Sequence, residues 1–161
     1  MTVIAWDGET LAADRQAVSD GCASLVEPKI GYVVRKSGEA FLYGYVGDIA
    51  DGEELLEWFQ KGAKKKKFPE HLREASCNTL LAIITDEGLV AEYFRSPYPV
   101  RHPVGGYAWG SGAAYALGVM EYGAVAQEAV EIASRFDVNS GGGVVSISFE
   151  IPEISTYHFD A

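Results

Sequence analysis

The chain has 161 residues, 48% of them hydrophobic, and a formal net charge of −10. This length fits one domain, residues 1–161, which can bury a sizeable core without disulfides or metals. We expect no nucleic-acid partner because the net charge opposes phosphate binding, and no membrane because no apolar run approaches the ~18 residues of a span.

The chain begins with a predicted hairpin. Residues 2–6 are apolar and partly β-branched, Asp7-Gly8 is a strong turn signal, and residues 10–13 return as a second strand. We therefore expect Thr2 and Asp14 near the same end of a tight hairpin.

The later elements are predicted in the order strands, one helix, strands, two helices, strand. Asp48 is expected to cap the first helix and Ser111 the next long one. The prolines make residues 96–105 irregular. The expected strands are 30–34, 40–46, 79–85, 89–94, 107–109 and 144–149, and the expected helices are 48–61, 69–75, 112–122 and 124–136. This order predicts an α+β fold with two mostly antiparallel sheets packed together and helices outside them.

Thr2 becomes a free N-terminal residue once Met1 is removed. The hydroxyl of such a threonine is a nucleophile, and the α-amino group beside it, which titrates near ~8, can accept the hydroxyl proton. Small second residues are common and usually have no such role. Thr2 is therefore a candidate nucleophile that depends on the rest of the chain for support.

The support comes from an ordered set of residues. Thr2, Asp14, Lys29 and Gly47 are followed by Gly110-Ser111-Gly112 at a helix start and by Asp137-Val138-Asn139-Ser140-Gly141-Gly142. This set resembles the proteasome β-subunit family of N-terminal nucleophile (Ntn) hydrolases, which includes HslV-like proteins, and the resemblance covers nearly the whole chain. It implies the four-layer αββα sandwich, in agreement with the order of the predicted elements.

The resemblance also implies a role for each matching residue. Thr2 would be the nucleophile, Lys29 the cation beside it, and Asp14 the partner that orients Lys29. The N–H of Gly47 would bind the oxyanion, next to the positive end of the following helix. The other implied positions surround the terminal amine and the nucleophilic water (Ser111, Asp137, Ser140) or bind substrate (Ala17, Tyr45, Ile49). Without the resemblance, Asp14 and Lys29 would be ordinary strand-end residues.

The sequence departs from the family in three places. The first hairpin is shorter, the helix after the lysine run 64–67 is brief, and we expect no propeptide before Thr2. Methionine aminopeptidase alone would then expose Thr2. The brief helix leaves open how the usual contacts between rings would form.

We expect no cofactor, no metal and no disulfide. Gly110-Ser111-Gly112 is close to a dinucleotide fingerprint, but Tyr115 stands in place of the third glycine and no parallel βαβ unit surrounds it. The three histidines, at positions 71, 102 and 158, have no Cys or His partner at ligand spacing. Cys22 and Cys77 form no metal-ligand spacing, and with no signal peptide before them we expect reduced thiols and a cytoplasmic protein.

The resulting hypothesis is a threonine-type endopeptidase that cleaves peptides or unfolded proteins within a proteasome-like homo-oligomeric ring. The predicted helix with Leu55, Trp58 and Phe59 has more apolar area than its core-facing side requires. This excess favours assembly with other subunits. No ATP-binding motif is present, so ATP-dependent unfolding would require a separate unfoldase. Two alternatives remain: a non-catalytic structural or assembly subunit of the same fold, for example in a phage particle, and an amidase for small amides.

Overall fold

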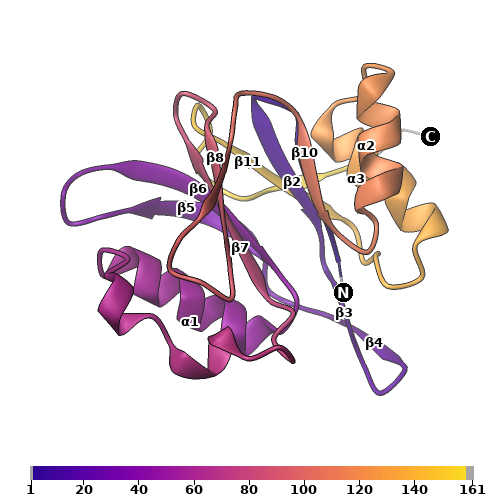
Figure 1. The fold of residues 1–161 in the computed structure, drawn as a ribbon. Coiled ribbons are helices and arrows are strands. Elements are labelled where there is room, and N and C mark those ends of the chain that lie inside the picture. The colour runs from indigo at the N-terminus through magenta and orange to yellow at the C-terminus, as the bar shows by residue number, and fades with distance from the viewer. Residues whose placement is uncertain (1, 159–161) are drawn as a thin grey trace.

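Two five-stranded antiparallel sheets lie face to face, and helices cover their outer faces, in the computed structural model of the chain (Figure 1). The structure describes residues 2–158. Successive side chains of a strand point to opposite faces of its sheet, and the central strands are buried at nearly every position, so each sheet presents one apolar face to the other sheet and one to the helices. The layers are therefore helix, sheet, sheet and helix, as the sequence predicts.

The first sheet has the strand order β10-β1-β2-β11-β12. Its central hairpin joins β1 (Val3–Trp6) to β2 (Thr10–Asp14), and Ile4 lies opposite Ala13 in their register. The outer strands are β10 (Tyr107–Gly110), β11 (Val144–Ser148) and β12 (Ser155–Tyr157).

The second sheet has the order β5-β6-β7-β8-β9, so each strand pairs with its neighbour in sequence. Its strands are β5 (Ile30–Val34), β6 (Ala40–Val46), β7 (Leu80–Thr85), β8 (Val90–Phe94) and β9 (Val100–His102). A separate two-stranded hairpin, β3 (Gln16–Ser19) and β4 (Cys22–Leu25), projects at one edge of the molecule (Figure 1).

The helices divide between the two outer layers. Helix α1 (Ile49–Gln60) and the short 3₁₀ helices η1 (Lys65–Lys67) and η2 (Glu70–Arg73) lie on the second sheet. Helices α2 (Ala113–Glu121) and α3 (Ala126–Phe136) lie on the first. Asp48 caps α1 as predicted, because its side chain accepts the Asp51 N–H at 3.1 Å. No described helix is long and apolar enough to cross a membrane.

Three apolar clusters separate the four layers. Large side chains such as Ile4, Trp6 and Leu42 fill the space between the sheets. The cluster beneath α2 and α3 is built largely from alanines, which allow close approach of the helices to the sheet. The cluster under α1 contains Leu55, Trp58 and Phe59, each at most 5% exposed. The idea that these three leave apolar area for a neighbouring subunit is therefore wrong, since the chain itself buries them.

The structure adds four strands that the sequence did not predict and shortens one helix. Strands β3 and β4 occupy much of the segment before Lys29, β9 lies within the proline-containing stretch, and β12 follows β11. The helix predicted over residues 69–75 is only the 3₁₀ turn η2, anchored by the buried Leu72. Short pieces of this kind carry little periodic signal of their own.

Candidate active site

Thr2 and Asp14 meet at the open end of the β1–β2 hairpin, whose register sets the start of β1 against the end of β2. Thr2 is 2% exposed, and its hydroxyl donates to Asp14 Oδ1. The Val3 N–H donates to the same oxygen at 3.1 Å. The predicted closeness of Thr2 and Asp14 is confirmed.

Lys29 lies immediately before β5 and brings an ammonium group to the same place. Its Nζ donates to Thr2 Oγ1, to Asp14 Oδ1 at 3.0 Å and to the Gln16 carbonyl oxygen at 2.9 Å. Burial lowers the pKa of Lys29 below 10.5, and the charge of Asp14 and its hydrogen bond offset only part of this effect. The three side chains assigned to the catalytic centre are thus in direct contact.

The second oxygen of Asp14 ties this hairpin to the loop before β11. Asp14 Oδ2 accepts the Gln16 N–H at 3.2 Å and the Gly141 N–H at 2.9 Å. A fully buried carboxylate requires such donors, because an unpaired charge away from water is strongly unfavourable. Asp14 is therefore held in one orientation beside Lys29.

A second acidic centre, at Asp137, borders the backbone of Thr2. Ser111 Oγ donates to Asp137 Oδ2 at 2.6 Å, Ser140 Oγ donates to the same oxygen, and the Asn139 N–H donates to Oδ1 at 3.1 Å. Burial raises the pKa of Asp137, but these hydrogen bonds outweigh it and hold the pKa below its ordinary 3.8. Ser111 Oγ also lies 3.5 Å from the Thr2 carbonyl oxygen, so the centre is next to Thr2.

Ser111 does not cap α2 as the sequence predicts. The cap position is held by Gly112, whose helix has no side-chain cap bond. Ser111 Oγ is directed to Asp137 instead. The preceding Gly110 has φ +94°, and a Cβ there would lie 1.9 Å from the Thr2 carbonyl oxygen. Glycine therefore lets this segment pass directly against the backbone of Thr2.

Gly47 forms the turn between β6 and α1. Its φ is +102°, and a Cβ would lie 2.7 Å from both the Asn78 carbonyl oxygen and Thr79 Cα. The steric reason for glycine here is thus the adjacent segment of the same chain, at Asn78 and Thr79. The Tyr45 N–H donates to the Lys29 carbonyl oxygen, and N–H directions alternate along a strand. We therefore expect the Gly47 N–H to point toward the same side as Lys29.

A cleft of about 280 Å³ connects these groups. Its lining contains Thr2, Lys29 and Gly47, together with two of the residues assigned to substrate binding, Ala17 and Ile49. The third, Tyr45, is not brought to the cleft. Its ring packs in the cluster under α1, and its hydroxyl donates to Glu53 at 2.5 Å. Burial and the nearby Glu53 raise the pKa of Tyr45 well above its ordinary value, so the hydroxyl stays protonated.

Strand β3, which the sequence did not predict, forms one wall of this cleft. Gln16, Val18 and Ser19 of β3 line it, as do Asp48 and Ala50. A local signal for the hairpin is present. Asp20-Gly21 is the same dipeptide as Asp7-Gly8 and forms a two-residue turn with φ of +51° and +77°.

The predicted removal of Met1 concerns a residue outside the described range, which begins at Thr2. The described part of the site nevertheless has a clear chemical capacity. It holds a hydroxyl against an ammonium of lowered pKa and against a carboxylate, beside a cleft. Such an arrangement is suited to activating an oxygen nucleophile.

The sequence matches no protein-family model and no curated protein. Solved structures are similar over nearly the full length. BPH of Thiobacillus denitrificans in complex with epoxomicin has a TM-score of 0.66 at 21% identity, covering 95% of this chain and 100% of that chain. Eukaryotic HslV of Trypanosoma brucei gives 0.65 at 20% identity, covering 97% and 99%. Anbu (ancestral beta-subunit) of Yersinia bercovieri gives 0.65 at 10% identity, covering 99% and 88%.

These similarities establish the fold. The chain has the α+β architecture of proteasome β-subunit-like Ntn hydrolases, as the resemblance implies. At identities of 21% and below they do not establish an activity. The function has to be argued from the site.

Proposed function

We propose that the chain is a threonine-type Ntn peptidase whose nucleophile is Thr2 Oγ1, made active by removal of Met1. The observation that carries the proposal is the contact of the Thr2 hydroxyl with both Lys29 and Asp14 beside a cleft. A threonine with only a structural role requires neither a buried ammonium of lowered pKa nor a hollow next to its side chain.

In the proposed reaction, Thr2 Oγ1 forms a bond to the carbonyl carbon of a peptide. Its proton passes to the α-amino group of Thr2, directly or through water, and then to the leaving amine as the C–N bond breaks. Water activated by the freed amine hydrolyses the resulting ester and restores the hydroxyl. Lys29 remains an ammonium, and its charge lowers the pKa of the α-amine so that this group serves as a base near neutral pH.

Gly47 is the proposed oxyanion donor. The negative charge that develops on the carbonyl oxygen requires a fixed donor, and a backbone N–H at the start of α1 also has the positive end of the helix behind it. Ala17 on β3 and Ile49 at the start of α1 line the same cleft and are proposed to contact the substrate. Asp137, Ser111 and Ser140 would hold the terminal amine and the attacking water.

The proposed substrate is a peptide or an unfolded protein, and the proposed assembly is a homo-oligomeric ring. An ATP-dependent unfoldase, if one delivers folded substrates, would be a separate protein. BPH, one of the structurally similar proteins, is bound to epoxomicin in its structure. We extend this to the present chain and propose that epoxomicin reacts with its Thr2.

The test combines intact mass with covalent labelling. We expect purified chain to lack Met1 and to gain the mass of one epoxomicin per chain at Thr2. Thr2→Ala should abolish both labelling and hydrolysis of small peptide amides while leaving the circular dichroism spectrum unchanged. Thr2→Ser, which keeps a hydroxyl, should retain measurable labelling.

Retention of Met1 on every chain would cap the amine and contradict the proposal in favour of a structural subunit. Labelling of Thr2→Ala at the wild-type rate would show that Thr2 is not the nucleophile. Hydrolysis of small amides with no cleavage of any peptide would favour the amidase.

A further inference from the structure

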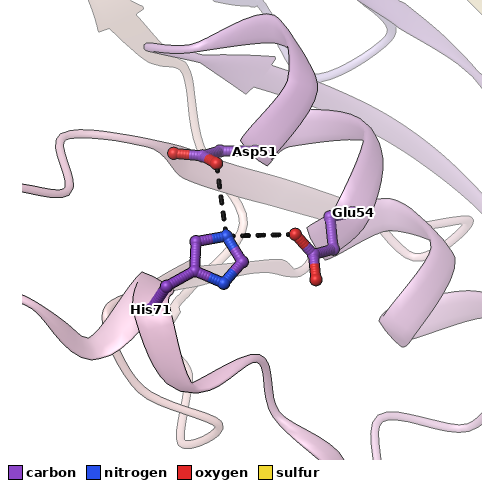
Figure 2. Close-up of side chains that lie close together, drawn as sticks. All are labelled: Asp51, Glu54 and His71. Carbon is purple, nitrogen blue, oxygen red and sulfur yellow. Dashed lines mark ion pairs between the residues drawn. The ribbon is translucent and has the colours of Figure 1, made fainter.

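A histidine and two carboxylates converge on the outer face of α1, away from Thr2. Asp51 and Glu54 stand one turn apart on α1, and His71 reaches them from η2 (Figure 2). His71 Nε2 lies 3.5 Å from Asp51 Oδ1 and 3.1 Å from Glu54 Oε2. One ligand atom from each of the three residues lies within 4.8 Å of the other two.

Both elements that carry these side chains are anchored in the core. Helix α1 buries Leu55 and Leu56 against the second sheet, which fixes the direction of its outer face. Turn η2 is held by Leu72, which is 1% exposed, so its neighbour His71 has a defined position over the helix. The three side chains are partly exposed and can be reached from solvent. The cluster is therefore both preorganised and open.

Two carboxylates that face one ring nitrogen favour a cation at that place. A neutral imidazole would present either a lone pair or a single N–H to the two carboxylates. A single N–H can form a straight hydrogen bond with only one acceptor. A metal ion would satisfy all three ligand atoms together. In a tetrahedral zinc site, with bonds of ~2.0–2.2 Å, neighbouring ligand atoms lie about 3.3–3.6 Å apart, close to the two distances from Nε2.

The local charge favours a cation as well. Helix α1 and its cap carry five carboxylates, at positions 48, 51, 53, 54 and 57. Lys61, Lys64 and Lys67 line a hollow together with Glu54 and supply some positive charge. Lys61 pairs with Glu57, but among residues 2–158 no ion pair joins any of the three lysines to Glu54. A divalent ion at the cluster would thus bind in a negative potential.

We propose that Asp51, Glu54 and His71 form a binding site for a divalent transition ion of the zinc type. The mixed nitrogen and oxygen ligands favour such an ion over Mg²⁺ or Ca²⁺, which prefer oxygen alone. Three protein ligands leave the fourth position to water. The ion would clamp η2 to the first two turns of α1, directly after Ile49 and Ala50 of the cleft. This site does not depend on the proposed peptidase activity.

This site cannot be predicted from the spacing of residues in the sequence, because the ligands come from two separate elements. The prediction of no metal rests on the absence of a second Cys or His near each histidine in sequence. Here the partners are carboxylates from about 20 residues earlier, brought close by the packing of η2 on α1. Nothing in the spacing of Asp51, Glu54 and His71 indicates that contact.

The test measures metal binding directly on chelator-treated full-length chain. Because the exposed Cys22 thiol would bind Zn²⁺ on its own, all measurements use a Cys22→Ala background. Calorimetry with Zn²⁺ should give one equivalent per chain, and Co²⁺ should give the visible absorption of a four-coordinate ion without a thiolate band. His71→Gln and the double variant Asp51→Asn/Glu54→Gln should each weaken Zn²⁺ binding by more than about tenfold, or 1.4 kcal/mol.

The matched controls are Glu57→Gln on the same helix and His158→Gln elsewhere on the surface. Both should bind Zn²⁺ as the background chain does, and Zn²⁺ should raise the melting temperature only where the three ligands are intact. Equal affinity in the background chain and His71→Gln would overturn the proposal, as would no binding of Zn²⁺ or Co²⁺ at about millimolar concentration. The cluster would then be a simple ion pair.

Discussion

Asp14 and Lys29 form a buried ion pair. Residues with only a structural role at the end of a strand do not need such a pair. Lys29 donates hydrogen bonds to Thr2, Asp14 and the Gln16 carbonyl oxygen. The second oxygen of Asp14 accepts hydrogen bonds from backbone N–H groups, among them that of Gly141. Burying an ion pair is often no better for stability than burying apolar residues of the same size. A role in chemistry explains this arrangement better than a role in stability.

We predict that Lys29→Ala lowers activity by orders of magnitude near neutral pH. The substitution removes the cation that lowers the α-amine pKa and leaves the negative charge of Asp14 next to that amine. Both changes raise the amine pKa, so a higher pH is needed to free the base, and remaining activity should shift to higher pH. The measurement is the pH profile of epoxomicin labelling. Lys29→Arg should restore little, because a guanidinium differs in size and geometry from an ammonium.

The control for this prediction separates chemistry from folding. Lys29→Ala also leaves Asp14 buried without its partner, which costs about 3–5 kcal/mol of unfolding free energy. The double variant Asp14→Asn/Lys29→Met removes both charges and should recover much of that stability without recovering activity. Equal labelling of wild type and Lys29→Ala at neutral pH would remove Lys29 from the site.

At the scale of elements, the turn at Gly47 couples the second sheet to the cleft. Gly47 and Gly62 flank α1 with nearly the same φ, +102° and +103°. A Cβ at Gly47 would lie 2.7 Å from backbone atoms of Asn78 and Thr79, whereas nothing lies within 4 Å of a Cβ at Gly62. The two positions thus share the backbone requirement and differ only in the surrounding space.

We predict that Gly47→Ala destabilises the chain by more than Gly62→Ala. Gly62→Ala should cost only the left-handed backbone, about 1–2 kcal/mol. Gly47→Ala carries the same cost plus the displacement of the segment before β7, about 1–3 kcal/mol more. Urea unfolding of both variants measures the difference. Equal costs would show that the Asn78–Thr79 segment yields freely, and would remove our steric reason for glycine at the turn.

Local sequence signals account for the elements that position the catalytic residues. The Asp7-Gly8 turn, the capping Asp48 and the long apolar strands are strong signals, and they bring Thr2, Asp14 and Gly47 near their observed places. Only the resemblance predicts the contact of Lys29 with Thr2, because this contact joins the two sheets and its residues are 27 positions apart. No local pattern encodes such a contact.

The elements that were missed have physical reasons of their own. Strand β4 is exposed throughout, so it shows no alternation of apolar and polar residues, and only the turn Asp20-Gly21 marks its hairpin. Strand β9 has three residues beside prolines and lies at a sheet edge, where proline is tolerated. The direction of Tyr45 toward α1 follows from strand alternation once the faces of β6 are known.

At the scale of the whole molecule, exposed apolar surface that could contact another subunit lies on the layer of α2 and α3, and α1 does not supply it. Helix α2 and the end of α3 expose an aromatic pair, Tyr115 and Phe136, whose rings stack with centroids 5.7 Å apart. Tyr122 and Val138 near the same helices are 96% and 87% exposed. Exposed apolar groups of this kind are typical of surfaces that contact other proteins.

We predict that the chain assembles into a ring-sized homo-oligomer and that this helical face takes part. Light scattering should give a mass several times the 17.4 kDa of one chain across a wide concentration range. The double variant Tyr115→Ser/Phe136→Ser should lower that mass without unfolding the chain, because the two residues are 46% and 64% exposed and lie outside the core. Ile151→Ser, at a 61% exposed apolar residue on another segment, is the control and should leave the mass unchanged.

A monomer at every concentration would contradict assembly, while an oligomer that tolerates the double variant would place the interface elsewhere. Neither result would alter the expected labelling of Thr2, since the contacts among Thr2, Asp14 and Lys29 lie within one chain.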